Sequence, residues 1–168
     1  MITRVWGAVV GEIVQLRSHP NAERVWLAQI RISRYGVPEQ IVFGGTRKLR
    51  RGDLVAVAPP GTLIKESHKD QPRRMRARNY RGERSHGMLC SLNELGWARG
   101  GPNEVAVLRD LRPGFVLDEL DPELRPAVVK KWDTAINTVD TMIISAEDVA
   151  AYRVSSPERD RVTGSAYF

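Results

Sequence analysis

The pattern of hydrophobic and polar positions predicts mostly short β-strands in the first half of the chain. In residues 25–32, Trp26 and Ile30 fall on one face and polar residues on the other, which is the period of a half-buried strand. Residues 5–16 are apolar on both faces and contain Gly7 and a second glycine, so we expect a long buried strand that bends at the glycines. The predicted strands are residues 5–16, 25–32, 40–43, 54–58 and 75–80.

The last of these strands carries a row of cationic side chains. The alternation places Met75 and Ala77 on one side of the strand. On the other side it places three arginines followed by a tyrosine, namely Arg74, Arg76, Arg78 and Tyr80. Five short strands with turn signals and no β-α-β spacing predict a mainly β fold, a five-stranded Greek-key barrel of the oligonucleotide-binding type (OB-fold). Such barrels bind nucleic acid on a strand face flanked by loops, so we expect the arginine row to form part of that face.

Helical patterns are confined to short segments and to the end of the chain. Ser91, followed three residues later by Glu94, forms a capping box, and Gly96 ends the helix after a turn or two. Further on, apolar residues recur every four positions, at Leu124, Val128, Trp132 and Ile136, and Pro126 either begins this helix or kinks it. We expect an OB-fold domain over residues 1–118 and a partly helical C-terminal extension over residues 119–168.

Length and composition fit one domain with its own core and an appendage. The chain has 168 residues, of which 42% are hydrophobic. Its single cysteine, Cys90, cannot form an internal disulfide and is expected to be a buried small hydrophobe. The longest uncharged stretch, residues 54–64, is much shorter than the roughly 20 apolar residues of a membrane span. We predict a cytoplasmic protein without a membrane contact, a metal site or a cofactor.

Charge is distributed unevenly along the chain, whose net charge is +6. Residues 47–84 hold twelve Lys or Arg and four acidic residues, a net charge of +8. Residues 115–150 hold eight acidic and three basic residues, a net charge of −5. A basic stretch of this kind indicates a polyanionic partner, although a solvated charged loop gives the same pattern.

Three stretches of the chain together resemble a known family of tRNA-binding domains. They read HPNAERVWLAQI at residues 19–30, GDLVAVAPPGTLI at 52–64 and RARNYRGERSHGMLCSLNELGW at 76–97. The most specific part is the run Arg81, Gly82, Ser85, Gly87, Met88 and Ser91. The resemblance covers about residues 5–118 and is to the N-terminal module of the bacterial phenylalanyl-tRNA synthetase beta subunit and to stand-alone bacterial tRNA-binding proteins. It implies an OB-fold that holds tRNA by its shape and its phosphate backbone.

The function expected for the chain follows from the same resemblance. The sequence has no phosphate-binding glycine loop and no adenylate-forming signature, so we predict a tRNA-binding protein that is not an enzyme. The alternative is a protein-docking module that associates with an aminoacyl-tRNA synthetase and for which tRNA binding is incidental. Relatives that stand alone form homodimers through their C-terminal part, which implies a homodimer here, with the acidic extension as the dimerisation or docking element.

The predicted tRNA-binding residues fall in and around the basic stretch. Arginine pairs with phosphate through two hydrogen bonds, and an exposed tyrosine can stack on a base. Some of the residues also have a purely structural interpretation: a helix cap for Ser91, core packing for Met88, a bond to the backbone for Ser85, and turn solvation for the two at 47 and 48. The full set is Arg47, Lys48, Lys65, Arg74, Arg76, Arg78, Tyr80, Arg81, Arg84, Ser85, Met88 and Ser91.

Overall fold

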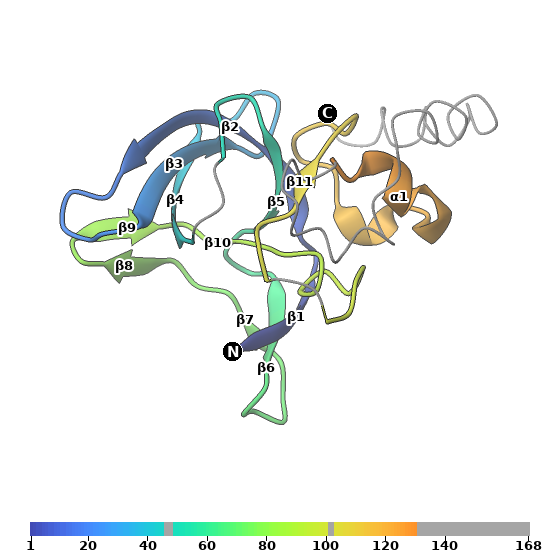
Figure 1. The fold of residues 1–168 in the computed structure, drawn as a ribbon. Coiled ribbons are helices and arrows are strands. Elements are labelled where there is room, and N and C mark those ends of the chain that lie inside the picture. The colour runs from blue at the N-terminus through green and yellow to red at the C-terminus, as the bar shows by residue number, and fades with distance from the viewer. Residues whose placement is uncertain (46–48, 101–102, 131–168) are drawn as a thin grey trace.

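Antiparallel strands form nearly all of the regular structure, which confirms the mainly β prediction. The computed structural model describes residues 1–45, 49–100 and 103–130 (Figure 1). The largest sheet has the order β10-β5-β2-β3-β4, with β11 also paired to β5, and two smaller sheets have the orders β1-β6-β7 and β8-β9. The strands are β1 Ile2–Trp6, β2 Val9–Ser18, β3 Val25–Arg31, β4 Glu39–Gly44, β5 Leu54–Ala58, β6 Leu63–Glu66, β7 Arg73–Arg74, β8 Arg78–Tyr80, β9 Glu83–Ser85, β10 Met88–Leu89 and β11 Val107–Leu108.

The central three predicted strands are present as β3, β4 and β5, but the first and last are each divided. The strand expected over residues 5–16 breaks into β1 and β2 at Gly7, whose φ is +87° and whose backbone N–H donates to Asp118 Oδ2 at 2.7 Å. The strand expected over residues 75–80 is also wrong as a single element. The backbone of Met75, directly after β7, is hydrogen-bonded to Thr62 and Gly61. A separate strand, β8, begins at Arg78 and pairs with β9.

The expected five-stranded barrel is not closed, because strand pairing stops at β4. Between β4 and the chain that leaves β9, one backbone hydrogen bond runs from the His86 N–H to the Gln40 carbonyl at 2.8 Å. Beside it, the backbone N–H of Val42 donates to Ser85 Oγ at 2.9 Å. We call this join the β4–β9 seam. A side chain thus supplies part of the contact that a strand ladder would make in a closed barrel.

Two hydrophobic clusters lie on either side of the main sheet. The smaller one packs Ile13, Ile30, Ile41, Val55 and Val107, together with neighbouring apolar residues. The larger one joins β1 and β6 to the end of the described chain and includes Val5, Ile64, Trp97, Phe115 and Leu120. Gly11 allows the sheet to pack closely, since a Cβ at this position would lie 2.5 Å from Ile30 Cγ2.

The C-terminal part of the described chain covers the larger cluster. It consists of two 3₁₀ turns, η1 Leu117–Glu119 and η2 Pro122–Leu124, and the short helix α1 Arg125–Val128, in which Pro126 occupies the first turn and therefore does not kink it. Leu124 and Val128 are 3% and 5% exposed and pack into the same cluster as Val5. The hydrophobic core thus continues past residue 118, and the boundary expected there stays a prediction.

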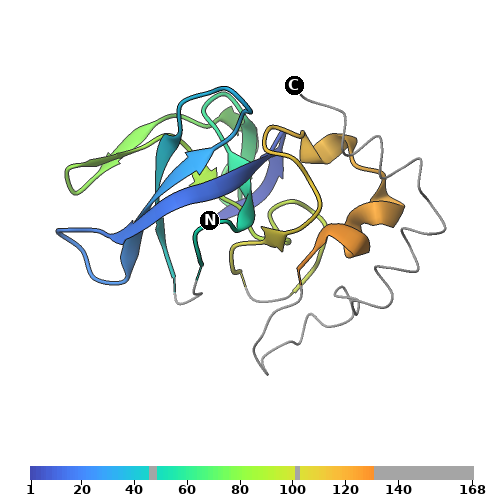
Figure 2. The same ribbon diagram turned by 90° about the horizontal axis from the view of Figure 1, so that it is seen from above.

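The rest of the predicted extension, including Trp132, Ile136 and the helix start at residue 145, lies outside the described residues. The described part of the extension carries Glu119, Asp121 and Glu123. It lies on the side of the molecule opposite the β8–β9 hairpin (Figures 1 and 2). The acidic segment therefore does not cover the arginines of the hairpin within the described residues.

Candidate nucleic-acid interface

The β8–β9 hairpin presents most of the predicted cations. Its turn is formed by Arg81 and Gly82, with φ of 48° and 89°, the positive pair that a two-residue type I′ turn requires. Arg78, Tyr80 and Arg84 are all exposed. Cross-strand partners share a face of a hairpin, so Arg78 lies on the face of its partner Ser85 and Arg84 on the opposite face with Asn79. The hairpin is therefore basic on both sides.

The exposed side of the run from β7 to β8 agrees with the sequence prediction. Arg74, Arg76 and Arg78 are exposed while Met75 between them is 7% exposed. Arg74 Nη1 donates to the Gly61 carbonyl at 2.7 Å, which fixes its side chain along the surface. Arginines 76 and 78 continue this row to the hairpin, and we call the exposed set the basic strip, made of Arg74, Arg76, Arg78, Tyr80, Arg81 and Arg84.

Tyr80 is the aromatic residue of this strip, and 42% of it is exposed. The guanidinium carbon of Arg81 lies 5.7 Å from the centre of the Tyr80 ring. The His19 ring is perpendicular to it, with 5.8 Å between centroids and 87° between planes. Both contacts hold the tyrosine ring at the surface, where it can stack on a base.

The turn between β2 and β3, which contains His19, is also part of this surface. His19 Nδ1 accepts from the Asn21 N–H at 2.9 Å, so its other nitrogen carries the proton and donates to the Tyr80 carbonyl at 2.9 Å. Arg81 Nη1 donates to the Asn21 carbonyl at 3.3 Å. These bonds join residues that are 60 or 61 positions apart in the sequence. No local sequence pattern could therefore indicate that the two turns are in contact.

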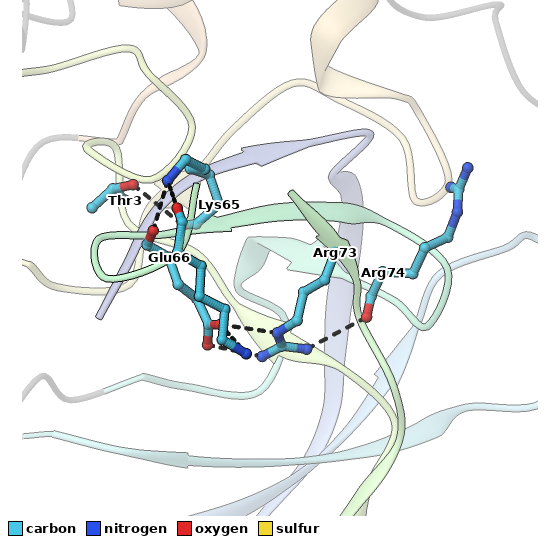
Figure 3. A network of polar contacts seen from close by, with 6 residues as sticks. Thr3, Lys65, Glu66, Arg73 and Arg74 are labelled. Carbon is cyan, nitrogen blue, oxygen red and sulfur yellow. Dashed lines mark hydrogen bonds and ion pairs between the residues drawn. The ribbon is translucent and has the colours of Figure 1, made fainter. Parts of the chain in front are cut away.

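Lys65, in contrast, is directed toward its own loop. Its Nζ donates to the Glu66 carbonyl at 2.9 Å and also to the Lys69 carbonyl (Figure 3). Glu66 accepts two hydrogen bonds from Arg73, at 3.0 and 3.1 Å, and lies 3.4 Å from Lys69 Nζ. Three of the cations counted in the basic stretch thus bond to acceptors of the same loop.

These contacts change the ionisation of Glu66. The hydrogen bonds from Arg73, followed by the Lys69 ammonium, lower the pKa of Glu66 from 4.5 to about 2 against the opposing effect of burial. Ionised Glu66 likewise raises the pKa of Arg73. The carboxylate therefore stays charged throughout the pH range in which tRNA binding would be measured.

We expect Glu66→Gln to remove one source of acid sensitivity. The folded pKa of Glu66 is below its unfolded value, so its contribution to stability is complete above about pH 4.5 and is lost as the pH falls toward 2. The difference in melting temperature between wild type and variant should therefore be largest near pH 7 and shrink toward pH 3. Arg73→Gln should give the same trend, and a difference that stays constant down to pH 3 would contradict this assignment.

The remaining predicted residues are engaged inside the protein or lie outside the described residues. Ser85 is 8% exposed, accepts from Val42 and donates to the Gly87 carbonyl at 2.9 Å, which is the backbone alternative. Ser91 is 2% exposed, and Met88 packs against the larger cluster. The residues at 47 and 48 are not among those described.

The capping box at Ser91 is formed as predicted. The Ser91 N–H donates to Glu94 Oε1 at 2.8 Å and the Glu94 N–H donates to Ser91 Oγ at 3.1 Å. The helix expected after the capping box is not formed: a single turn closes with the bond from the Leu95 N–H to the Ser91 carbonyl at 3.1 Å, and Gly96, with φ of +75°, ends it. Burial raises the pKa of Glu94, and hydrogen bonding of its carboxyl group to the backbone and side chain of Ser91 lowers it in part.

The neighbouring Cys90 is fully buried, as predicted, and burial raises the pKa of its thiol well above the usual range. Within residues 1–45, 49–100 and 103–130, no three His, Cys, Asp or Glu side chains are grouped so as to hold a metal ion. In the same part of the chain no helix is long and apolar enough to cross a membrane.

Comparisons with known proteins agree with the resemblance found in the sequence. A family model described as "Putative tRNA binding domain" matches residues 8–115. The phenylalanine–tRNA ligase beta subunit of Thermosynechococcus vestitus is 36% identical over 159 residues, which cover 88% of this chain and 18% of that protein. The corresponding subunit of Salinibacter ruber is 38% identical over 95 residues, or 54% of this chain and 11% of that protein.

The chain thus spans less than a fifth of the length of these curated relatives. Among solved structures, the C-terminal domain of Plasmodium vivax p43 gives a TM-score of 0.46 at 18% identity, over 68% of this chain and 59% of that chain. The family match covers the basic strip, the β2–β3 turn and the capping box. The chain belongs to the family of tRNA-binding domains, and the matched region is shared with phenylalanine–tRNA ligase beta subunits.

Proposed function

We propose that this chain binds tRNA through the basic strip, by contacts to the phosphate backbone. The observation that carries the proposal is the exposed, two-sided β8–β9 hairpin, which lies inside the region matched by the family model. Arginine guanidinium groups suit phosphate because they donate two parallel hydrogen bonds. Phosphate contacts position a protein on RNA without reading its sequence, so recognition would depend on the shape of the folded tRNA.

We propose that the chain acts in the cytoplasm as a binding protein and not as an enzyme.

In this proposal, three polar groups do not contact phosphate: the hydroxyls of Ser85 and Ser91, and Lys65 Nζ. Each of these groups has a partner within the protein. Met88 supports the surface from the core side. In this proposal, the basic strip supplies the electrostatic attraction to the tRNA backbone.

Binding is expected to depend strongly on salt. If the strip neutralises about four to six phosphates, the logarithm of the affinity should fall with the logarithm of the salt concentration at a slope of about −3 to −5. Filter binding at low and moderate salt measures this slope. Equal affinity for folded tRNA and for an unstructured RNA of the same length would contradict recognition by shape, and no RNA binding at low salt would favour the docking alternative.

We also propose that the protein forms a homodimer through residues beyond 130. Leu124 and Val128 already pack on the core of their own chain, so a truncation that tests the dimer should keep them and end at Lys130. Light scattering is expected to give a dimer for the full chain and a monomer for the chain ending at Lys130. A monomeric full chain at micromolar concentration would overturn the dimer.

A further inference from the structure

An open depression lies at one end of the basic strip, between the β2–β3 turn and the β8–β9 turn. It is lined by His19, Pro20, Asn21, Ala22, Glu23, Tyr80 and Arg81. Both turns lie at the left of Figure 1. The lining combines an exposed aromatic ring with polar side chains, which is the composition of sites that take an unstacked nucleobase.

The depression is held in shape by contacts between the two turns. His19 bonds to the Asn21 N–H and to the Tyr80 carbonyl through its two ring nitrogens. Arg81 and Asn21 exchange two longer bonds, at 3.3 and 3.5 Å, each from a side chain to the other's backbone carbonyl. A ligand entering the depression therefore meets a site that is already ordered, which reduces the entropic cost of binding.

Charge distinguishes this depression from the rest of the strip. The carboxylate of Glu23 and the guanidinium of Arg81 both line it, and their formal charges cancel. A phosphate group would be attracted to Arg76 or Arg78 and repelled by the carboxylate of Glu23. A neutral group with hydrogen-bond donors suits the depression better.

The acceptor available in the depression selects among neutral bases. Within the described residues, the Glu23 side chain makes no hydrogen bond or ion pair with the protein, so both carboxylate oxygens can accept from a ligand. Guanine alone among the four RNA bases carries two adjacent donors, N1–H and the N2 amino group, on its Watson–Crick edge. A carboxylate accepts both at once, as it does the paired donors of arginine.

We infer that the depression binds one unstacked guanine, with its ring on Tyr80 and its Watson–Crick edge on Glu23. The inference rests on the proposed function, since the guanine belongs to an RNA whose phosphates lie on the basic strip. It adds a base preference to a surface otherwise selective for shape. Adenine and uracil lack the donor pair, and inosine lacks only the amino group, so guanine should bind best and inosine next.

The test is competition against labelled tRNA, followed by fluorescence anisotropy. The competitors are the pentaribonucleotides UUGUU, UUIUU, UUAUU and UUUUU, where I is inosine. For the wild type, UUGUU should displace tRNA at about a tenfold lower concentration than UUUUU, the size expected for a good bidentate contact. UUIUU should fall between them, and UUAUU should match UUUUU.

Substitutions at Glu23 and Tyr80 test whether these two residues cause the preference for guanine. Glu23→Gln should abolish it, so that the four pentamers compete within about twofold of one another. Tyr80→Leu should weaken competition by UUGUU by about tenfold through loss of stacking. Glu119→Gln removes an exposed carboxylate of η1, which does not line the depression, and should keep the preference. All three positions are exposed, so folding is expected to be preserved.

The outcomes separate this inference from the proposed function. If the wild type does not bind labelled tRNA, the proposed function itself fails. If it binds tRNA but all pentamers compete equally, or none competes at millimolar concentration, the guanine site is overturned and the phosphate contacts stand. A preference that survives Glu23→Gln would also overturn it.

Discussion

Replacing Arg76, Arg78 and Arg84 together with alanine is expected to weaken tRNA binding by about a hundredfold near 0.1 M salt. Each lost phosphate contact should also make the salt slope shallower by about one, so the triple variant should lose about three. Arg81 is kept because it bonds to Asn21 and shapes the neighbouring depression. Filter binding over a range of salt concentrations measures both effects.

A matched control removes the same charge elsewhere. Arg34, Arg99 and Arg112 are exposed and lie outside the basic strip, so replacing all three with alanine should reduce affinity much less. Both triple variants should melt close to the wild type, because exposed charges contribute little to stability. Normal binding by the first triple variant would show that the hairpin is the wrong site. If the first triple variant binds weakly as expected, Arg78→Ala and Arg84→Ala, measured separately, tell which side of the hairpin faces RNA.

Gly87→Ala is expected to destabilise the protein by about 3–5 kcal/mol. A Cβ at Gly87 would lie 2.3 Å from the Ala58 carbonyl oxygen, and the φ of +127° is one that alanine avoids. Since the obstacle is backbone, β5 or β10 would have to move. Urea unfolding monitored by fluorescence should therefore show a large fall in the midpoint.

Gly82→Ala is the matched control within the same sequence run. Gly82 also has a positive φ, of +89°, but a Cβ there would meet nothing within 4 Å. The expected cost is about 1–2 kcal/mol, the strain of a left-handed conformation alone. Equal unfolding midpoints for the two variants would contradict the role assigned to the close approach at Gly87.

The sequence was most informative where a pattern is local. Strands β3, β4 and β5 follow alternation or β-branched runs, and the capping box at Ser91 is a four-residue signal that the structure forms with both of its hydrogen bonds. The exposure of Arg74, Arg76 and Arg78 around buried Met75 follows from the same alternation. In these segments, the side chains that decide the structure are neighbours along the chain.

Features that depend on distant partners could not be predicted. The break at Gly7 depends on Asp118, and β7 to β10 are two or three residues long, too short for any periodicity. Likewise, spacing alone marks Leu124 and Val128 as buried but does not say that their own core covers them. For the candidate site, the arginines were found from charge, whereas Glu23 and Asn21 join it only through the folded β2–β3 turn.

The β4–β9 seam has a consequence for the way the protein opens. The hydrogen bonds of β3 with β4 form a backbone ladder from Val25 to Ile30. Within the described residues, the seam has a backbone bond from the His86 N–H to the Gln40 carbonyl, and its other bonds involve side chains, from the Val42 N–H to Ser85 Oγ and from Gln40 Nε2 to the Arg84 carbonyl and Glu83. Local unfolding begins where the fewest bonds must break, so we expect amide hydrogens at Val42 and His86 to exchange with solvent sooner than those in β3. When the seam opens, the β8–β9 hairpin would still be held by its contacts with the β2–β3 turn, from His19 to Tyr80 and between Asn21 and Arg81, while the main sheet stays intact.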